Sequence, residues 1–383
     1  MYRTKHGKGK TQWKGNDRMI HPNDRITTPQ AAVILANILL GVGFLTLPRV
    51  LAEKMMTPDG WITVIAGGII SFGFGLIMVK LSQRFPGKTF FEYSQFITGK
   101  WVGWALNLVL IIYFALFAGY EIRDMSEIIK YFLLEQTPKE FIILVFMCVG
   151  VYLTAGGMNP IARMLELILP FTLIVIIFSF SLSLKLFEID NLRPVLGWGL
   201  GPVLKGLPET WRSFAGIETI LFVTAFMSRP EKAGKALLAG IGISVFIYLL
   251  TVITVMGGIP FEQVATLMWP TISIVRSYEL TGFFLERYES LLIVVRLVQV
   301  FAGYVIYHYI VAVGISQTFN KEYHRYLYIV LPVIFLIAMY PKSMNQLNEF
   351  GDVIGKIFLG IICLVAPALL LITLLRRISH VQK

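Results

Sequence analysis

The stretch Asn37–Arg49 reads NILLGVGFLTLPR, and it decides the fold. Gly41, Gly43 and Pro48 interrupt a segment that is otherwise apolar. Glycine lacks a Cβ atom and proline lacks a backbone N–H, so both disfavour a continuous helix at this point. A broken helix frees backbone amides that can hold a carboxylate and carbonyls that can hold an amine. The stretch therefore predicts an interrupted helix with a ligand-binding role.

The composition places this helix in a membrane. Of the 383 residues, 56% are hydrophobic and only 15% are charged, whereas soluble domains carry about 25% charged residues. The two cysteines, Cys148 and Cys363, both lie in apolar runs, which argues against a disulfide framework or a cysteine metal site. The net charge of +11 is spread over loops. We therefore expect an all-α integral membrane protein with no cofactor, no metal and no nucleic-acid partner.

Ten apolar runs approach the roughly 20 residues that a transmembrane helix needs. They are 28–54, 60–82, 101–134, 140–156, 164–187, 209–228, 236–257, 291–318, 326–341 and 353–375. The run 209–228 is the weakest because it contains Glu218. The segment 259–279 is broken by Pro260 and Pro270, and we interpret it as an interfacial loop.

The polar residues 1–25 have no apolar run, so no cleavable signal peptide is expected. The division into domains is a basic cytoplasmic tail, 1–25, followed by a ten-helix transmembrane domain, 26–383. Basic residues dominate both tails and the second, sixth and eighth connections. The third connection instead carries the acids Glu121, Asp124, Glu127, Glu135 and Glu140. This alternation predicts that both termini are cytoplasmic.

A second interruption lies five spans after the first, at Trp211–Thr219, which reads WRSFAGIET. The small pair Ala215 and Gly216 precedes the Glu218 carboxylate at mid-membrane depth. Matched breaks in the first and sixth helices are typical of a five-plus-five inverted repeat. The alternative for the glycines is close helix packing, which is common in membrane proteins.

A carboxylate inside the membrane is costly and indicates function by default. Glu218 could hold a ligand amine, or it could form an ion pair with Arg296 in the eighth span; the sequence leaves both open. Tyr113 in the third span could place its hydroxyl in a cavity or donate to a buried carbonyl. His308 has no second metal-binding residue at a suitable spacing, so it is interpreted as part of a packed polar face.

Signatures of enzymes are missing from the sequence, which has no GxGxxG after a strand, no Walker loop and no HExxH. Gly197, Gly199 and Gly201 form a GxGxG run, but in a predicted external loop where it indicates nothing about nucleotides. No catalytic residue is predicted.

The chain resembles the B subunit of bacterial spore germinant receptors, within the amino acid–polyamine–organocation transporter superfamily. The resemblance runs from about Ile26 to Arg377. It is carried by Gly41–Arg49 and by four loop strings that membrane packing does not require. These strings are TPDGWIT from Thr57, NLRPVLGWGLGP from Asn191, MWPTIS from Met268 and LERYES from Leu285.

The resemblance implies a LeuT-like fold of ten transmembrane helices, the spore inner membrane as location, and a complex with an A subunit and a lipoprotein C subunit. It also implies that the chain senses a small nutrient germinant, such as an amino acid. Matching the motifs gives the ligand-binding residues Gly41, Val42, Gly43, Tyr113, Phe214, Ala215, Gly216 and Glu218, with Arg296 as the intramembrane charge partner.

Two other functions remain open. The first is a working transporter for an amino acid or amine, although Leu297–Tyr304 lacks the Ser/Thr pair that the superfamily resemblance implies for sodium coupling. The second is a pore in which Glu218 and Arg296 line a route for water or ions.

Overall fold

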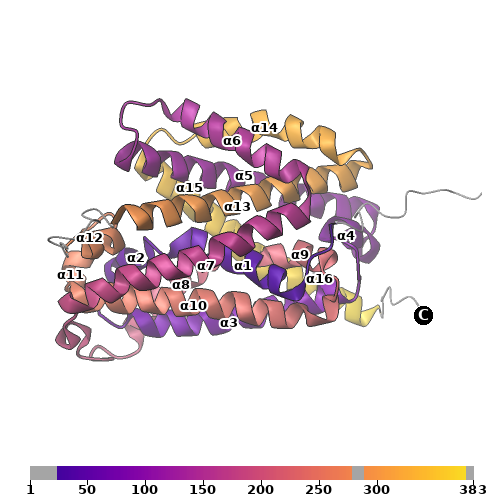
Figure 1. Cartoon of the computed structure of the whole chain (residues 1–383). Coiled ribbons are helices and arrows are strands. Elements are labelled where there is room, and N and C mark those ends of the chain that lie inside the picture. Colours follow the sequence, from indigo (N-terminus) through magenta and orange to yellow (C-terminus); the bar gives the residue numbers. More distant parts are fainter. Residues whose placement is uncertain (1–23, 278–288, 377–383) are drawn as a thin grey trace, which may run out of the picture.

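The protein is a bundle of helices, shown by a computed structural model that describes residues 24–277 and 289–376 (Figure 1). Within these ranges there is no strand, and a single β-bridge joins Ile26 to Met227. The longer helices are α1 (Thr28–Gly43), α3 (Gly60–Gln83), α5 (Lys100–Phe132), α6 (Lys139–Ala155), α7 (Met158–Ser183), α10 (Ala233–Gly258), α13 (Glu289–Phe319), α14 (Tyr323–Met339) and α15 (Met344–Gly360). The shorter helices are α2 (Leu47–Met55), α4 (Phe90–Thr98), α8 (Gly201–Arg212), α9 (Ile220–Phe226), α11 (Phe261–Val264), α12 (Pro270–Arg276) and α16 (Ala366–Leu375).

Six helical units in the described ranges are long and apolar enough to cross a membrane: α3, α5, α7, α10, α13 and the continuous α15–α16. The pair α1 and α2 passes the same test as one unit that is bent by 53°. The other predicted spans, 140–156, 209–228 and 326–341, coincide with α6, α8–α9 and α14. These three are helical but too short for the test, so their crossing of the membrane stays a prediction.

The structure corrects the start of one helix and the assignment of one loop. The last helix begins at Met344 rather than near 353, because its first half is amphipathic and does not read as an apolar run. The segment predicted as a loop, 259–279, holds the short helices α11 and α12 in its described part, and each follows or begins with a proline. Of the predicted basic tail, only Asp24 and Arg25 belong to the described residues.

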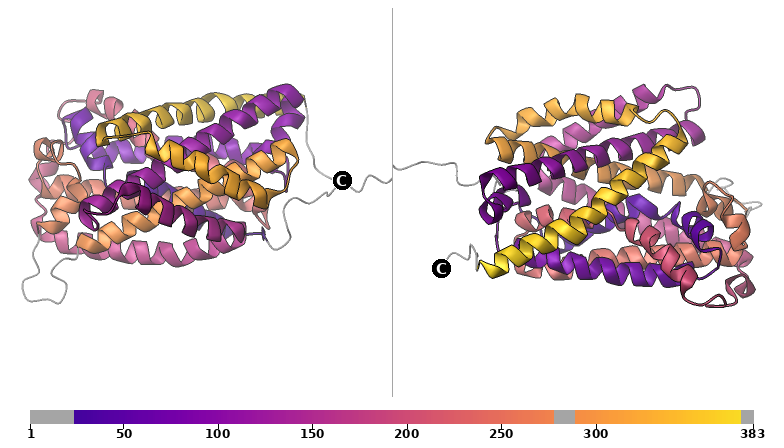
Figure 2. Two further views of the ribbon diagram at one scale, coloured as in Figure 1. Left: turned by 90° about the horizontal axis from the view of Figure 1, so that it is seen from above. Right: turned by 180° about the vertical axis from the view of Figure 1, so that it is seen from behind.

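The helices lie roughly parallel, with α5 beside α13 through the middle of the bundle (Figure 1). Seen from behind, α15 and α16 form one diagonal helix across the bundle (Figure 2). At one end lie α2, α8, α11 and α12, and at the other lie α4, α9 and the last residues of α16. The bundle thus has two distinct ends, and the two interrupted helices run between them.

The start of α1 is held to the end of α9. Thr27 and Gln30 form a capping box at the first turn of α1, in which each side chain accepts from the other residue's backbone N–H. The backbone of Ile26 donates to Phe226 (2.9 Å) and accepts from Ser228 (2.8 Å). These bonds bring the two interrupted helices together at one end, and further along the second break packs beside the last turns of α1, with Gly216 next to Ile38 and Ser213 next to Gly43.

Candidate ligand-binding site at the helix breaks

The first break lies slightly later than the sequence predicted. Gly41 and Gly43 belong to the last turn of α1, and the chain leaves the helix at Phe44–Thr46 before α2 begins at Leu47. A Cβ atom on Gly41 would stand 3.1 Å from the Gln299 carbonyl oxygen of α13. These two glycines therefore allow close packing, the alternative that the sequence left open, while the break follows them.

Side chains from three other helices satisfy the carbonyls at the end of α1. The Arg296 guanidinium of α13 donates to the Gly41 carbonyl, and Thr271 of α12 donates to Leu45 (3.1 Å). The Tyr248 hydroxyl of α10 lies within hydrogen-bonding distance of both the Leu39 and the Ser213 carbonyls. Because Ser213 belongs to the second break, Tyr248 connects the two breaks.

The second break is built around Gly216 and Glu218. Gly216 has φ +106°, a conformation that favours glycine. Its backbone N–H donates to one oxygen of the fully buried Glu218 carboxylate (2.9 Å), and the Tyr113 hydroxyl donates to the other (2.7 Å). The Glu218 carboxylate thereby accepts a hydrogen bond from a backbone N–H that the interruption leaves without a partner in the helix.

The predicted ion pair between Glu218 and Arg296 is not formed, which corrects the sequence-based alternative. Arg296 pairs instead with Asp124 of α5, at 2.5 Å between Nη2 and Oδ2. Both side chains are largely buried, with 5% and 11% of their surfaces exposed. Tyr113 supplies the partner of Glu218, and it does so from the same helix as Asp124.

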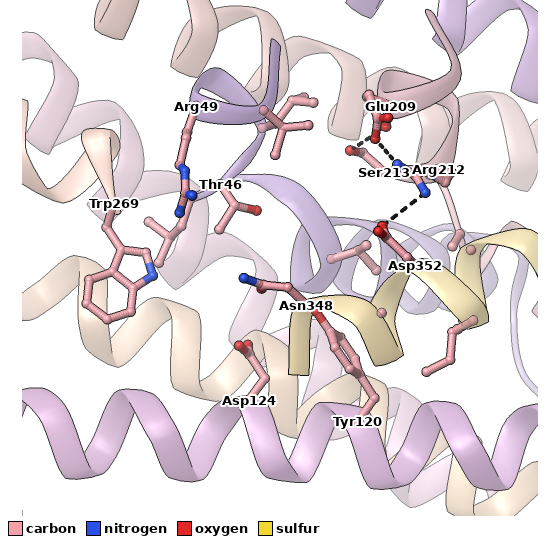
Figure 3. Close-up of a pocket in the computed structure, with 18 of the residues that line it drawn as sticks. Thr46, Arg49, Tyr120, Asp124, Glu209, Arg212, Ser213, Trp269, Asn348 and Asp352 are labelled. Atoms are coloured by element: carbon pink, nitrogen blue, oxygen red, sulfur yellow. Dashed lines mark hydrogen bonds and ion pairs between the residues drawn. The ribbon is translucent and has the colours of Figure 1, made fainter. Parts of the chain in front are cut away.

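A cavity of about 390 Å³ opens beside both breaks (Figure 3). Its walls come from the end of α1, from α2, α5, α8 and α15, and from Trp269 and Arg296. Among the predicted residues, Val42, Ala215 and Arg296 line the cavity. The other six, Gly41, Gly43, Tyr113, Phe214, Gly216 and Glu218, are not among its lining residues, and they are all buried.

Most of the polar side chains that line the cavity were missed by the sequence reasoning. They include Arg49, Tyr120, Asp124, Arg212, Asn348 and Asp352. Asp124 was counted among the acids of the third connection, although the predicted run 101–134 contains it, and the structure places it within α5, which runs on to Phe132. Glu121 and Asp124 are three residues apart and so share a helix face. This spacing was the available signal that α5 continues with a buried acidic face.

Comparison with known proteins gives both the family and the fold. The family model described as "Spore germination protein" (Spore_permease) matches residues 25–347. Spore germination protein YndE of Bacillus subtilis (strain 168) is 41% identical over 94% of this chain and 99% of its own length. Spore germination proteins A2 and B2 of the same organism are 39% and 32% identical, over 93% and 88% of this chain and 97% and 92% of their own.

Two solved structures share the fold at low sequence identity. MhsT in complex with L-phenylalanine has a TM-score of 0.64 and 12% identity, over 92% of this chain and 98% of that one. The nucleobase-cation-symport-1 family transporter MHP1, with bromovinylhydantoin bound, has a TM-score of 0.64 and 17% identity, over 93% and 81%. The bundle with its interrupted helices is thus a LeuT-type transporter fold, and the chain belongs to the family of spore germination proteins.

Proposed function

We propose that this chain is the membrane subunit of a spore nutrient-germinant receptor, and that a small germinant such as an amino acid binds in the cavity between the two breaks. The observation that carries the proposal is the position of Val42 and Ala215. One residue from each interrupted helix meets at the cavity wall. Val42 also stands midway along the bent unit 28–55, which supports a binding position near the bilayer midplane.

The proposed topology has ten membrane-spanning units in a five-plus-five inverted repeat, with α6, α8–α9 and α14 as the shorter spans. Both termini are cytoplasmic in this topology, as the basic tails suggest. The cavity then faces the outside, because it is lined by α2 and by the first half of α15 at the end opposite to α4. The location is the inner membrane of the spore, and the A and C subunits of the receptor are the protein partners.

Binding at this place has a physical route to a signal. The cavity touches the end of α1 and the second break, where the Gly41 carbonyl is held by Arg296 and the Ser213 carbonyl is held by Tyr248. A ligand that binds one arrangement of these helices better shifts the protein toward it. In this proposal, germination is the response of the partner subunits to that shift.

We test the proposal by filling the cavity with Ala215→Trp, in spores whose only germinant receptor contains this chain. The indole would occupy space that the ligand needs, and a loss of about 1.4–2.8 kcal/mol in binding free energy would raise the nutrient concentration for half-maximal germination about 10- to 100-fold. The matched control is Leu167→Trp, at a position that is 77% exposed on the lipid-facing side of α7. Unchanged nutrient sensitivity in the Ala215 variant, at normal abundance in the membrane, would refute the cavity as the binding site.

The second candidate function is a transporter for an amino acid or amine, and the fold similarity to two transporters favours it. Uptake of a labelled ligand into proteoliposomes separates the two functions. A sensor binds the ligand without accumulating it, whereas a transporter accumulates or exchanges it.

A further inference from the structure

Among the residues that the structure describes, the charged side chains in the interior of the cavity are paired, with one exception. Arg212 forms ion pairs with Glu209 and, at 3.0 Å, with Asp352 (Figure 3). Arg296 is taken by Asp124 and by the Gly41 carbonyl. Glu53 and Lys54 also line the cavity, but they are exposed at its rim, at the end of α2. Water can therefore solvate the charges of Glu53 and Lys54, which need no partner within the protein.

Arg49 is the exception. It stands in the first turn of α2, immediately after the break, and its side chain is only partly exposed. Figure 3 shows its guanidinium pointing into the pocket, between Thr46 and Trp269. Within residues 24–277 and 289–376, no carboxylate, carbonyl or ring of the chain pairs with it, although Asp124 and Asp352 line the same cavity and serve other arginines.

We infer that Arg49 holds an anionic group of the ligand, so that the cavity selects small molecules that carry a carboxylate. This inference rests on the proposed function and names the chemistry of its ligand. A guanidinium presents its donors in a planar fork that fits a carboxylate with two parallel hydrogen bonds. A carboxylate would balance the one charge in the cavity interior that the described chain leaves without a partner. An amide or hydroxyl oxygen of a neutral ligand can accept a hydrogen bond from Arg49, but it leaves the charge of the guanidinium unbalanced.

The neighbours of Arg49 suit the remainder of such a ligand. Trp269 packs on Tyr131 and Phe132 of α5 at centroid distances of 4.9 and 5.1 Å, which holds its indole in place at the cavity wall. Val42 and Leu45 add apolar surface from the first break. A ligand with a short apolar group next to its carboxylate would therefore contact the aromatic surface of Trp269 and the aliphatic surface of Val42 and Leu45.

The test compares acids with their amides on the full-length chain in lipid nanodiscs. Thermal stabilisation is measured with the twenty common L-amino acids, with the amide of each one that binds, and with D-glucose as a neutral probe. We expect the wild-type chain to bind the acid about 10- to 100-fold more tightly than the amide, the range expected for hydrogen bonds to a charged group. Arg49→Gln should weaken binding of the acid by the same factor and leave binding of the amide unchanged.

Lys54→Gln is the matched control, because it removes a cation at the exposed rim and should leave both affinities unchanged. Equal affinity of the wild-type chain for acid and amide, or an unchanged acid affinity in Arg49→Gln, overturns the inference. Preferential binding of D-glucose also overturns it. In these cases the proposed function survives if Ala215→Trp weakens binding of the probe that does stabilise the wild-type chain. If no probe stabilises the wild-type chain, both the inference about Arg49 and the proposal that a small nutrient binds in the cavity are refuted.

Discussion

Arg296→Met is expected to destabilise the protein by about 3–5 kcal/mol, the usual cost of removing one partner of a buried ion pair. The substitution leaves Asp124 without its 2.5 Å partner and the Gly41 carbonyl without its donor. Glu121 adds to the loss, because it is buried within electrostatic reach of Arg296 and its Oε2 atom has no hydrogen-bond partner in the described chain. The measurement is the thermal unfolding of the chain in one bilayer composition.

A double-mutant cycle makes this prediction specific. Asp124→Leu should cost less than Arg296→Met, because Arg296 keeps its hydrogen bond to the Gly41 carbonyl and lies within electrostatic reach of Glu121. The double mutant should be more stable than the sum of the two single losses predicts, since neither charge is then left alone. Additive effects would show that the two side chains do not stabilise each other.

Gly216→Ala is expected to have the second largest effect. The positive φ of +106° costs about 1–3 kcal/mol for a residue with a Cβ atom. The new Cβ would also stand 2.4 Å from Cγ2 of Ile38 in α1, and such overpacking costs about 1–3 kcal/mol more. A shift of Gly216 would in addition pull its N–H away from Glu218. We therefore expect a clear drop in melting temperature together with weaker ligand binding.

Gly242→Ala is the control for this substitution, because Gly242 lies inside α10 and its Cβ would meet nothing within 4 Å. Alanine is favoured over glycine in a helix interior by about 1 kcal/mol. The control should therefore be neutral or slightly stabilising. Equal melting temperatures for the two variants would show that the second break does not depend on the conformation of Gly216.

Glycine and proline predicted the first break, slightly too early, and the pair Ala215 and Gly216 predicted the second, since backbone preference is local and can be read from one segment. The depth of Glu218 inside the bundle also followed, because a run of apolar residues surrounds it. Its partners could not be predicted in the same way. Tyr113 and Arg296 are each a plausible partner for a buried carboxylate, and only the packing of α5 against the second break selects Tyr113.

The residues that line the cavity could be predicted only in part, because many of them are polar. Hydropathy finds helices by their lipid-facing and buried apolar residues, whereas the cavity is lined by polar faces of the same helices. Asp124 in α5 and Asn348 in α15 were therefore assigned to connections or left outside the spans. The acidic spacing in α5 and the amphipathic start of α15 were the local signals for these faces.

The central claim is that the ligand binds in the cavity beside the first break, and cysteine protection tests it most directly. Thr46→Cys places a thiol in the cavity wall of a chain in which Cys148 and Cys363 are replaced by alanine. We expect a membrane-impermeant thiol reagent to label this cysteine from the outside. A germinant at about ten times its Kd should slow that labelling about 10-fold, since it occupies most of the sites. Lys54→Cys at the rim should be labelled equally fast with and without germinant. A germinant that stabilises the protein and yet leaves the labelling of Thr46→Cys unchanged would contradict the account.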